Sequence, residues 1–157
     1  MLMLSVFHFY VHLYIPSSLV VDYKYLQQDP RLNPLISKLP LKKILYTNGT
    51  IQHAKLCLFL LNIQDNFDNI VCREDVGYIL KPHPKSFEIF SNLSHIYDND
   101  KVVFFEDSIE NLIIAKTNFN WITVLIQPQK INLKHIDFWF PDIITAINFF
   151  LDKINNK

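Results

Sequence analysis

Short apolar runs alternate with longer amphipathic stretches along most of this chain, and this alternation constrains the fold more than any other feature. Strands are predicted from apolar runs at 43–46, 70–72, 102–105 and 121–126. Helices are predicted from the spacing of apolar residues and from turn signals at 31–38, 51–62, 84–95, 108–116 and 141–155. Strands that alternate with helices form a parallel sheet with helices on both faces. The expected fold class is therefore α/β.

Size and composition are those of one globular domain. The chain has 157 residues, of which 50% are hydrophobic, and its 15 basic and 15 acidic side chains cancel. No basic excess therefore indicates a nucleic-acid partner. Cys57 and Cys72 provide no disulfide framework, which favours a cytoplasmic location. Gly49 and Gly77 are the only glycines, which excludes a GxGxxG or Walker-type phosphate loop.

The N-terminal segment 1–21 carries no Asp, Glu, Lys or Arg, and three interpretations fit it: buried core, unprocessed leader or membrane anchor. The segment lacks a positively charged start and a small-residue cleavage site. Pro16 also ends any helix before the length of about 20 apolar residues that spans a bilayer. We therefore favour core or leader over an anchor.

Polar groups follow two of the predicted strands directly. Thr47 follows the run 43–46, and the pair Glu106-Asp107 follows the run 102–105. In a parallel α/β sheet, ligands bind at the carboxyl ends of the strands. The sequence therefore predicts that these groups share one site.

Thr47 and Lys81 are the predicted phosphate-binding residues. The Thr47 hydroxyl, together with the backbone amides of Asn48 and Gly49, suits a phosphate oxygen at a helix N-terminus. The alternative is an ordinary turn before a helix that Thr50 caps. Lys81 has the charge to neutralise a phosphate and a nearby carboxylate, and the prolines that follow it, Pro82 and Pro84, restrict the backbone and hold it in a fixed loop. The alternative is a solvated surface lysine.

Glu106-Asp107 is the predicted metal site. Two carboxylates at a strand end suit Mg²⁺, which retains several waters and needs only one or two protein carboxylates. The alternative is acidic capping of the helix that starts at Ser108. Two adjacent charges after a buried run favour the metal. His53 and Cys57 share a helix face, but they lack the further ligands of a zinc site and are predicted to be buried neutral side chains.

The order of these groups carries a resemblance. YTNGT (46–50), LKPHPKSF (80–87) and FFEDSIENLIIAK (104–116) resemble the second, third and fourth motifs of the haloacid dehalogenase (HAD) superfamily. Within it, the segments YVHLYIP and 22–48 look like the pyrimidine 5′-nucleotidase-like group, and the resemblance covers roughly residues 10–127. It implies a Rossmann-like three-layer α/β/α core at 41–157. It also implies that residues 1–40 are the remnant of a mostly absent cap and its exit, with an apolar N-terminus.

The resemblance also implies a mechanism. An aspartate attacks the phosphorus of a small phosphorylated substrate, such as a nucleoside monophosphate, and water then hydrolyses the aspartyl-phosphate. Mg²⁺, held by Glu106 and Asp107, screens the phosphoryl charge, while Thr47 and Lys81 bind the phosphoryl oxygens. Lys81 also keeps the nucleophile ionised.

One motif of the family is missing. No DxDx[ST] sequence occurs in the chain, and Asp22 follows the cap-like segment instead of preceding it. Residues 2–7 suit the central strand but contain no carboxylate. We therefore expect an incomplete phosphatase without turnover, which an in-frame DxDxT in the upstream DNA would explain. The alternatives are a non-catalytic binding or regulatory module and a fragment attached to a membrane through residues 1–15. The oligomeric state does not follow from the sequence.

Overall fold

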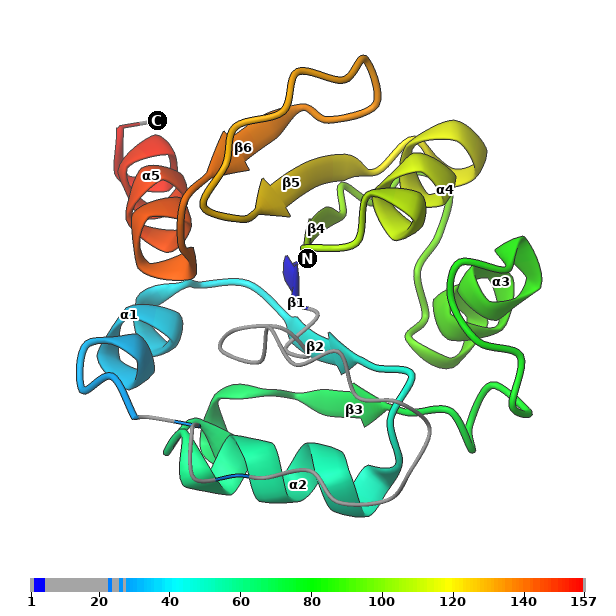
Figure 1. Cartoon of the computed structure of the whole chain (residues 1–157), viewed down its shortest axis with the longest axis horizontal. Helices are drawn as coiled ribbons and strands as arrows, with labels where there is room; N and C mark the ends of the chain where they lie inside the picture. Colours follow the sequence, from blue (N-terminus) through cyan, green and yellow to red (C-terminus); the bar gives the residue numbers. More distant parts are fainter. Residues whose placement is uncertain (1, 5–22, 24–25, 27, 157) are drawn as a thin grey trace.

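One six-stranded sheet, in which every neighbouring pair is parallel, forms the centre of the molecule (Figure 1). The computed structural model describes residues 2–4, 23, 26 and 28–156. The strand order is β3-β2-β1-β4-β5-β6. The strands are β1 (Leu2–Leu4), β2 (Lys43–Tyr46), β3 (Asn69–Val71), β4 (Val103–Glu106), β5 (Ile122–Ile126) and β6 (Phe138–Phe140).

The N-terminal strand β1 occupies the middle of this sheet. It pairs with β2 on one side and β4 on the other, and Leu4 lies opposite both Leu45 and Phe105. The predicted central strand at 2–7 is thus confirmed for residues 2–4, while residues 5–7 lie outside the described part of the chain. The carboxyl ends of β2 and β4 therefore flank the carboxyl end of β1.

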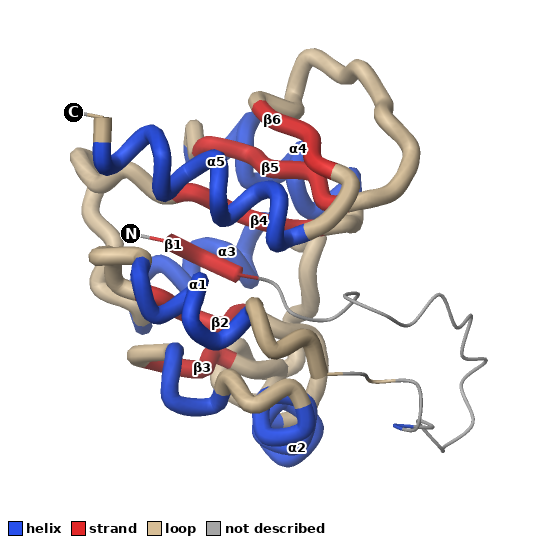
Figure 2. The backbone as a smooth tube through the Cα atoms, turned by 90° about the vertical axis from the view of Figure 1, so that its left-hand side faces the viewer, coloured by secondary structure: helices blue, strands red, loops and turns tan. Residues whose placement is uncertain are grey.

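The described residues form five α-helices. Figure 2 shows these helices on the two faces of the sheet. They are α1 (Leu32–Lys38), α2 (Ile51–Leu60), α3 (Pro84–Leu93), α4 (Ile109–Phe119) and α5 (Ile143–Asn155). Helices α1, α2 and α5 pack on one face, and α3 and α4 pack on the other. The chain therefore has the predicted three-layer α/β/α architecture. Within the described residues, no helix is both long enough and apolar enough to span a lipid bilayer.

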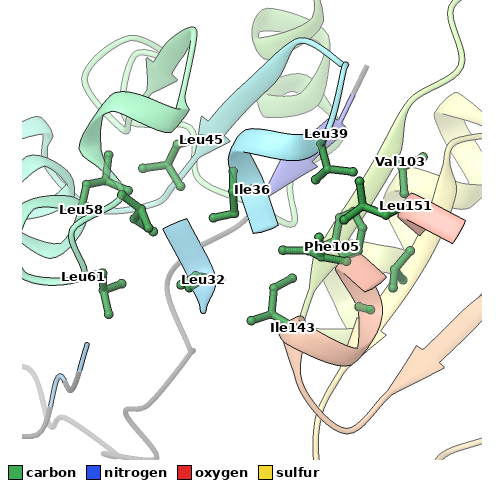
Figure 3. Close-up of a cluster of buried hydrophobic side chains, with 14 of the residues drawn as sticks. Leu32, Ile36, Leu39, Leu45, Leu58, Leu61, Val103, Phe105, Ile143 and Leu151 are labelled. Carbon is green, nitrogen blue, oxygen red and sulfur yellow. The ribbon is translucent and has the colours of Figure 1, made fainter. Parts of the chain in front are cut away.

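The core on the first face is mainly aliphatic. Successive side chains of a strand point to opposite faces, so Phe105 belongs to this core and Phe104 to the other. Figure 3 shows side chains of α1, α5 and the strands converging here, among them Leu32, Ile36, Leu45, Phe105, Ile143 and Leu151. These contacts hold α1 and α5 against the sheet.

The core on the second face is aromatic. The rings of Tyr46 and Phe90 stack with their centroids 4.3 Å apart, and Phe87 meets the edge of Phe104 at 6.1 Å. Trp121 packs against Phe90 with centroids 6.0 Å apart. Such ring pairs stabilise a core beyond the burial of their area. This aromatic core lies directly beneath the site described below.

Local capping signals explain most helix starts. The Thr50 hydroxyl accepts from the His53 N–H at 3.2 Å, and Asp142 accepts from the Thr145 N–H at 2.8 Å. Pro84 occupies the first turn of α3, as predicted. Ser108 stands at the N-cap position of α4, but its hydroxyl donates to Glu110 and makes no capping bond.

Two features differ from the sequence prediction. Strand β6 and the short 3₁₀ helix η2 (Gln64–Asn66) were not predicted. Strand β6 has only three residues, all half-buried, so its apolar pattern is too short to recognise. The division predicted between 1–40 and 41–157 stays a prediction; β1 belongs to the sheet and α1 packs within the core on its first face.

Candidate phosphate and metal site

The structure brings Thr47, Lys81 and Glu106 together at the carboxyl edge of the sheet. Thr47 follows β2, Glu106 ends β4, and Lys81 comes from the loop between β3 and α3. The Lys81 ammonium donates to Glu106 Oε2 and to the backbone carbonyl of Tyr46, both at 3.0 Å. The Lys81 and Glu106 side chains are each only 3% exposed, so this is a buried ion pair.

The backbone of Lys81 is held by the side chain of Asn48. Asn48 Nδ2 donates to the Lys81 carbonyl at 3.0 Å, and Asn48 Oδ1 accepts from the Lys81 N–H at 2.9 Å. The Lys81–Pro82 peptide bond is cis. The Lys81 ammonium also lies over the Tyr46 ring, 4.6 Å from its centroid, which adds a cation–π contact. The sequence predicted only a backbone contact to phosphate for Asn48 and missed this role of its side chain.

Glu106 is ionised and fully hydrogen-bonded. Its Oε1 accepts from the backbone N–H groups of Asp107 at 3.0 Å and Ser108 at 3.2 Å. Its Oε2 accepts from Lys81 and from Asn111 Nδ2, each at 3.0 Å. Burial by itself would raise the pKa of Glu106, but the Lys81 charge and these hydrogen bonds lower it to about 2. Each carboxylate oxygen thus has two donors, which fill its lone-pair positions.

Asp107 has the opposite electrostatic environment. Its partial burial, together with a hydrogen bond to the adjacent Glu106 carboxylate and charge repulsion by it, raises the pKa of Asp107 to about 8. Without a cation beside it, Asp107 therefore holds a proton at neutral pH. A carboxyl group with such a pKa in a family site is a candidate functional group.

Thr47 is fully buried, and the loop that follows it folds back on its hydroxyl. Thr47 Oγ1 accepts from the Gly49 N–H at 3.0 Å. The Gly49 amide, predicted to bind phosphate, is therefore engaged within the loop. A hydroxyl oxygen that accepts a hydrogen bond still carries one O–H donor.

The described residues contain no carboxylate in the position of the family's nucleophile. Strand β1 consists of Leu2, Met3 and Leu4. The one DxD in the sequence, Asp98-Asn99-Asp100, precedes β4 and so lies at the amino end of that strand, away from the site. Asp22 lies outside the described residues.

In the described part of the chain, no group of three or more His, Cys, Asp or Glu side chains comes together, here or elsewhere. His53 and Cys57 are half-buried, and the Cys57 thiol lies 3.6 Å from His53 Nε2. Tyr23 contacts the other ring nitrogen of His53 at 2.5 Å. Burial lowers the pKa of His53 and raises that of Cys57, so both are neutral at pH 7, as predicted.

Comparison with known proteins identifies the family. Residues 11–117 match the family model of haloacid dehalogenase-like hydrolases. This match spans more than half of the chain, and the chain therefore belongs to the haloacid dehalogenase-like hydrolase family.

Solved structures of this superfamily share the fold. They include L-2-haloacid dehalogenase from Xanthobacter autotrophicus with chloropropionic acid covalently bound (17% identity, 77% of this chain and 60% of that chain covered, TM-score 0.64). A HAD phosphatase from Thermococcus onnurineus is 21% identical over 78% of this chain and 57% of that one, with a TM-score of 0.63. The magnesium-bound putative HAD-hydrolase YfnB from Bacillus subtilis is 18% identical over 76% and 54%, with a TM-score of 0.64. The chain thus spans 54–60% of the length of these proteins.

The raised pKa of Asp107 predicts how the free energy of unfolding depends on pH. A carboxyl whose folded-state pKa lies above its unfolded value of about 3.9 stabilises the fold at low pH, and this contribution is lost as the pH rises through about 8. Asp107→Asn removes this titration. In the absence of divalent cations, we compare the free energies of unfolding of Asp107→Asn and of the natural chain. From pH 5 to pH 9, this difference should change by more than about 1 kcal/mol in favour of the variant. Urea unfolding at both pH values measures the difference, and a pH-independent difference would contradict the assignment.

Proposed function

We propose that this chain binds phosphate and Mg²⁺ as the core of a HAD-type phosphatase, with phosphomonoesters as its ligands. The observation that carries the proposal is the buried Lys81–Glu106 pair. The Lys81 ammonium donates to the carbonyl of Tyr46, the residue before Thr47, and to Glu106, the residue before Asp107. In this role, Lys81 and the Thr47 hydroxyl bind phosphoryl oxygens. A cation and a hydroxyl donor in a buried site interact more strongly with a phosphate than they would in water.

Of the two adjacent carboxylates, Asp107 is the one that suits Mg²⁺ as a direct ligand. Donors from Asp107, Ser108, Lys81 and Asn111 already occupy both oxygens of Glu106, so that residue holds Lys81 and does not offer a free oxygen to the cation. Mg²⁺ is commonly bound by one carboxylate together with waters and substrate phosphate oxygens. We therefore propose Asp107 as the direct ligand. The cation would supply charge neutralisation at the phosphoryl group and would displace the Asp107 proton.

We further propose that the chain binds its ligand without turning it over. Hydrolysis in this family requires an aspartate that attacks phosphorus, and neither β1 nor a DxDx[ST] motif provides one. Among phosphomonoesters, nucleoside monophosphates are the proposed class, on the resemblance to the pyrimidine 5′-nucleotidase-like group. Thr47 is fully buried, so the ligand reaches it only if this edge of the sheet rearranges.

Calorimetric titration with inorganic phosphate tests the site. Because Mg²⁺ and phosphate complete each other's coordination, we expect phosphate to bind at least about tenfold more tightly with Mg²⁺ than without it. Thr47→Val is expected to weaken binding about tenfold or more, because it removes a hydrogen bond to a charged group. Asp107→Asn is expected to abolish the Mg²⁺ effect.

Thr123→Val is the matched control, because Thr123 is also a fully buried threonine but lies on β5 and bonds to Asp137 and the His135 carbonyl. Its phosphate affinity should equal that of the natural chain. Absence of phosphate binding in the natural chain would refute the proposed function. Mg²⁺-dependent hydrolysis of p-nitrophenyl phosphate would refute the proposed lack of turnover, and competition by uridine monophosphate against glycerol phosphate tests the ligand class.

A further inference from the structure

Asn111 is a buried polar residue of α4 whose contact the family site does not explain. It is 7% exposed, and its Nδ2 donates to Glu106 Oε2 at 3.0 Å. The same oxygen accepts from the Lys81 ammonium, also at 3.0 Å. One carboxylate oxygen thus joins the phosphate-binding lysine to a neutral amide.

The local fold explains why Asn111 reaches this oxygen. Glu106 has the same parity on β4 as Phe104 and therefore points to the face covered by α3 and α4. The chain turns at Asp107 and Ser108, and α4 begins at Ile109. The third residue of the helix is then carried back over the end of the strand that precedes it. Asn111 thus contacts a residue only five positions earlier in the chain.

The contact matters because Glu106 is charged and buried. The backbone donors on Oε1 are its immediate neighbours, Asp107 and Ser108, and they hold that oxygen whatever the side chain on α4. Oε2 has no backbone donor among the described residues, so Asn111 is the group that keeps it aligned with Lys81. An amide does this without adding charge to the ion pair, whereas a carboxylate at position 111 would repel Glu106.

We propose that Asn111 is a positioning residue, which holds Glu106 Oε2 so that the Lys81 ammonium stays at the phosphate site. The phosphate ligand in this proposal rests on the proposed function, whereas the hydrogen bonds that join Asn111, Glu106 and Lys81 do not depend on it. Asparagine is a poorer helix former than leucine, so the helix alone does not favour it at this position. Asn111→Leu removes the donor while nearly conserving volume.

Two measurements test the proposal. The first is the affinity for inorganic phosphate in the presence of Mg²⁺, which Asn111→Leu should lower about tenfold, the loss of roughly one charge-assisted hydrogen bond. The second is the hydrogen exchange of the Lys81 ammonium, followed by NMR and assigned through the side-chain carbons of Lys81. Exchange should become about tenfold faster in the variant, because the ammonium is less firmly held. Asn111→Ser keeps a smaller donor, so its phosphate affinity and its Lys81 exchange rate should lie between those of the natural chain and Asn111→Leu. The serine variant replaces Asn111→Leu in both measurements if the leucine variant does not fold.

Asn66→Leu is the control, since Asn66 is a similarly buried asparagine, 8% exposed, that donates to Ser37 Oγ far from the site. It should lower stability but leave phosphate affinity and Lys81 exchange unchanged. Natural affinity and slow exchange in Asn111→Leu, with only stability lost, would overturn the proposal. If the natural chain does not bind phosphate, the proposed function fails, while the exchange of the Lys81 ammonium still decides whether Asn111 positions it.

Discussion

Replacing Lys81 with methionine is expected to lower the free energy of unfolding at pH 7 by about 3–5 kcal/mol. The variant keeps the apolar stem of the lysine but leaves Glu106 buried at 3% exposure without its countercharge. A buried charge that loses its partner must either bear the full cost of desolvation or take up a proton. Urea unfolding monitored by circular dichroism measures the loss.

Two comparisons separate the buried pair from ion pairs in general. Lys85 also pairs with a glutamate, Glu88, at 2.8 Å, but both side chains are more than half exposed. Lys85→Met should therefore cost less than about 1 kcal/mol. The double variant Lys81→Met/Glu106→Leu should recover most of the loss, because no buried charge remains. Equal losses for Lys81→Met and Lys85→Met would contradict the buried pair.

The pH dependence of Lys81→Met follows from the lowered pKa of Glu106. A carboxyl whose pKa falls from about 4.3 in the unfolded chain to about 2 in the folded chain stabilises the fold above the unfolded pKa. That contribution is lost as the pH falls towards 2. The stability gap between the natural chain and Lys81→Met should therefore be largest near neutral pH and should narrow below about pH 4.

Phe87→Ala is the second substitution with a large expected effect, a loss of about 3–5 kcal/mol. Phe87 has no exposed surface, and its ring contacts four others, those of Tyr46, Phe104, Phe119 and Trp121. Truncation leaves a cavity that these rigid rings cannot easily fill. Because Tyr46 and Phe104 lie under the Lys81 ammonium, the variant should also bind phosphate less tightly.

Phe59→Ala is the control for Phe87→Ala. Phe59 lies on α2 and is 67% exposed, so its truncation should change the free energy of unfolding by no more than about 0.5 kcal/mol. Thermal or urea unfolding of both variants at one pH gives the comparison. A loss at Phe87 as small as that at Phe59 would mean that the aromatic core does not support this face of the sheet.

Much of the fold was predictable because its signals are local. The capping residues Thr50 and Asp142 and the first-turn Pro84 mark helix starts in the sequence. Strand β6 was missed because three half-buried residues carry too little pattern. The packing of β1 and α1 into the core did not follow from the sequence, because it depends on contacts with residues far along the chain.

The sequence identified several residues of the candidate site but not what each side chain does there. Placement at strand ends predicted that Thr47 and Glu106 lie at one edge of the sheet, and the charge of Lys81 predicted a nearby carboxylate, which agrees with the Lys81–Glu106 ion pair at 3.0 Å. The metal role predicted for Glu106 stays a prediction, and the hydrogen bonds to its oxygens lead us to propose Asp107 in its place. No sequence pattern pointed to the side chains of Asn48 and Asn111. A polar residue in the first turn after a strand-end carboxylate is the signal that would have suggested Asn111.

By itself, the sequence determined the α/β class, the order of most elements and the family. Periodicity, capping residues and each motif depend on residues that are close together in the chain. Only the tertiary structure decided that the two adjacent carboxyl groups, Glu106 and Asp107, differ in charge. Glu106 lies on the covered face of β4, where Lys81 and Asn111 hold it ionised, whereas Asp107 begins the turn and, without a cation beside it, holds a proton at neutral pH. Burial and the partners within hydrogen-bonding distance set the charge of each carboxyl group, and residues far apart in the chain provide them.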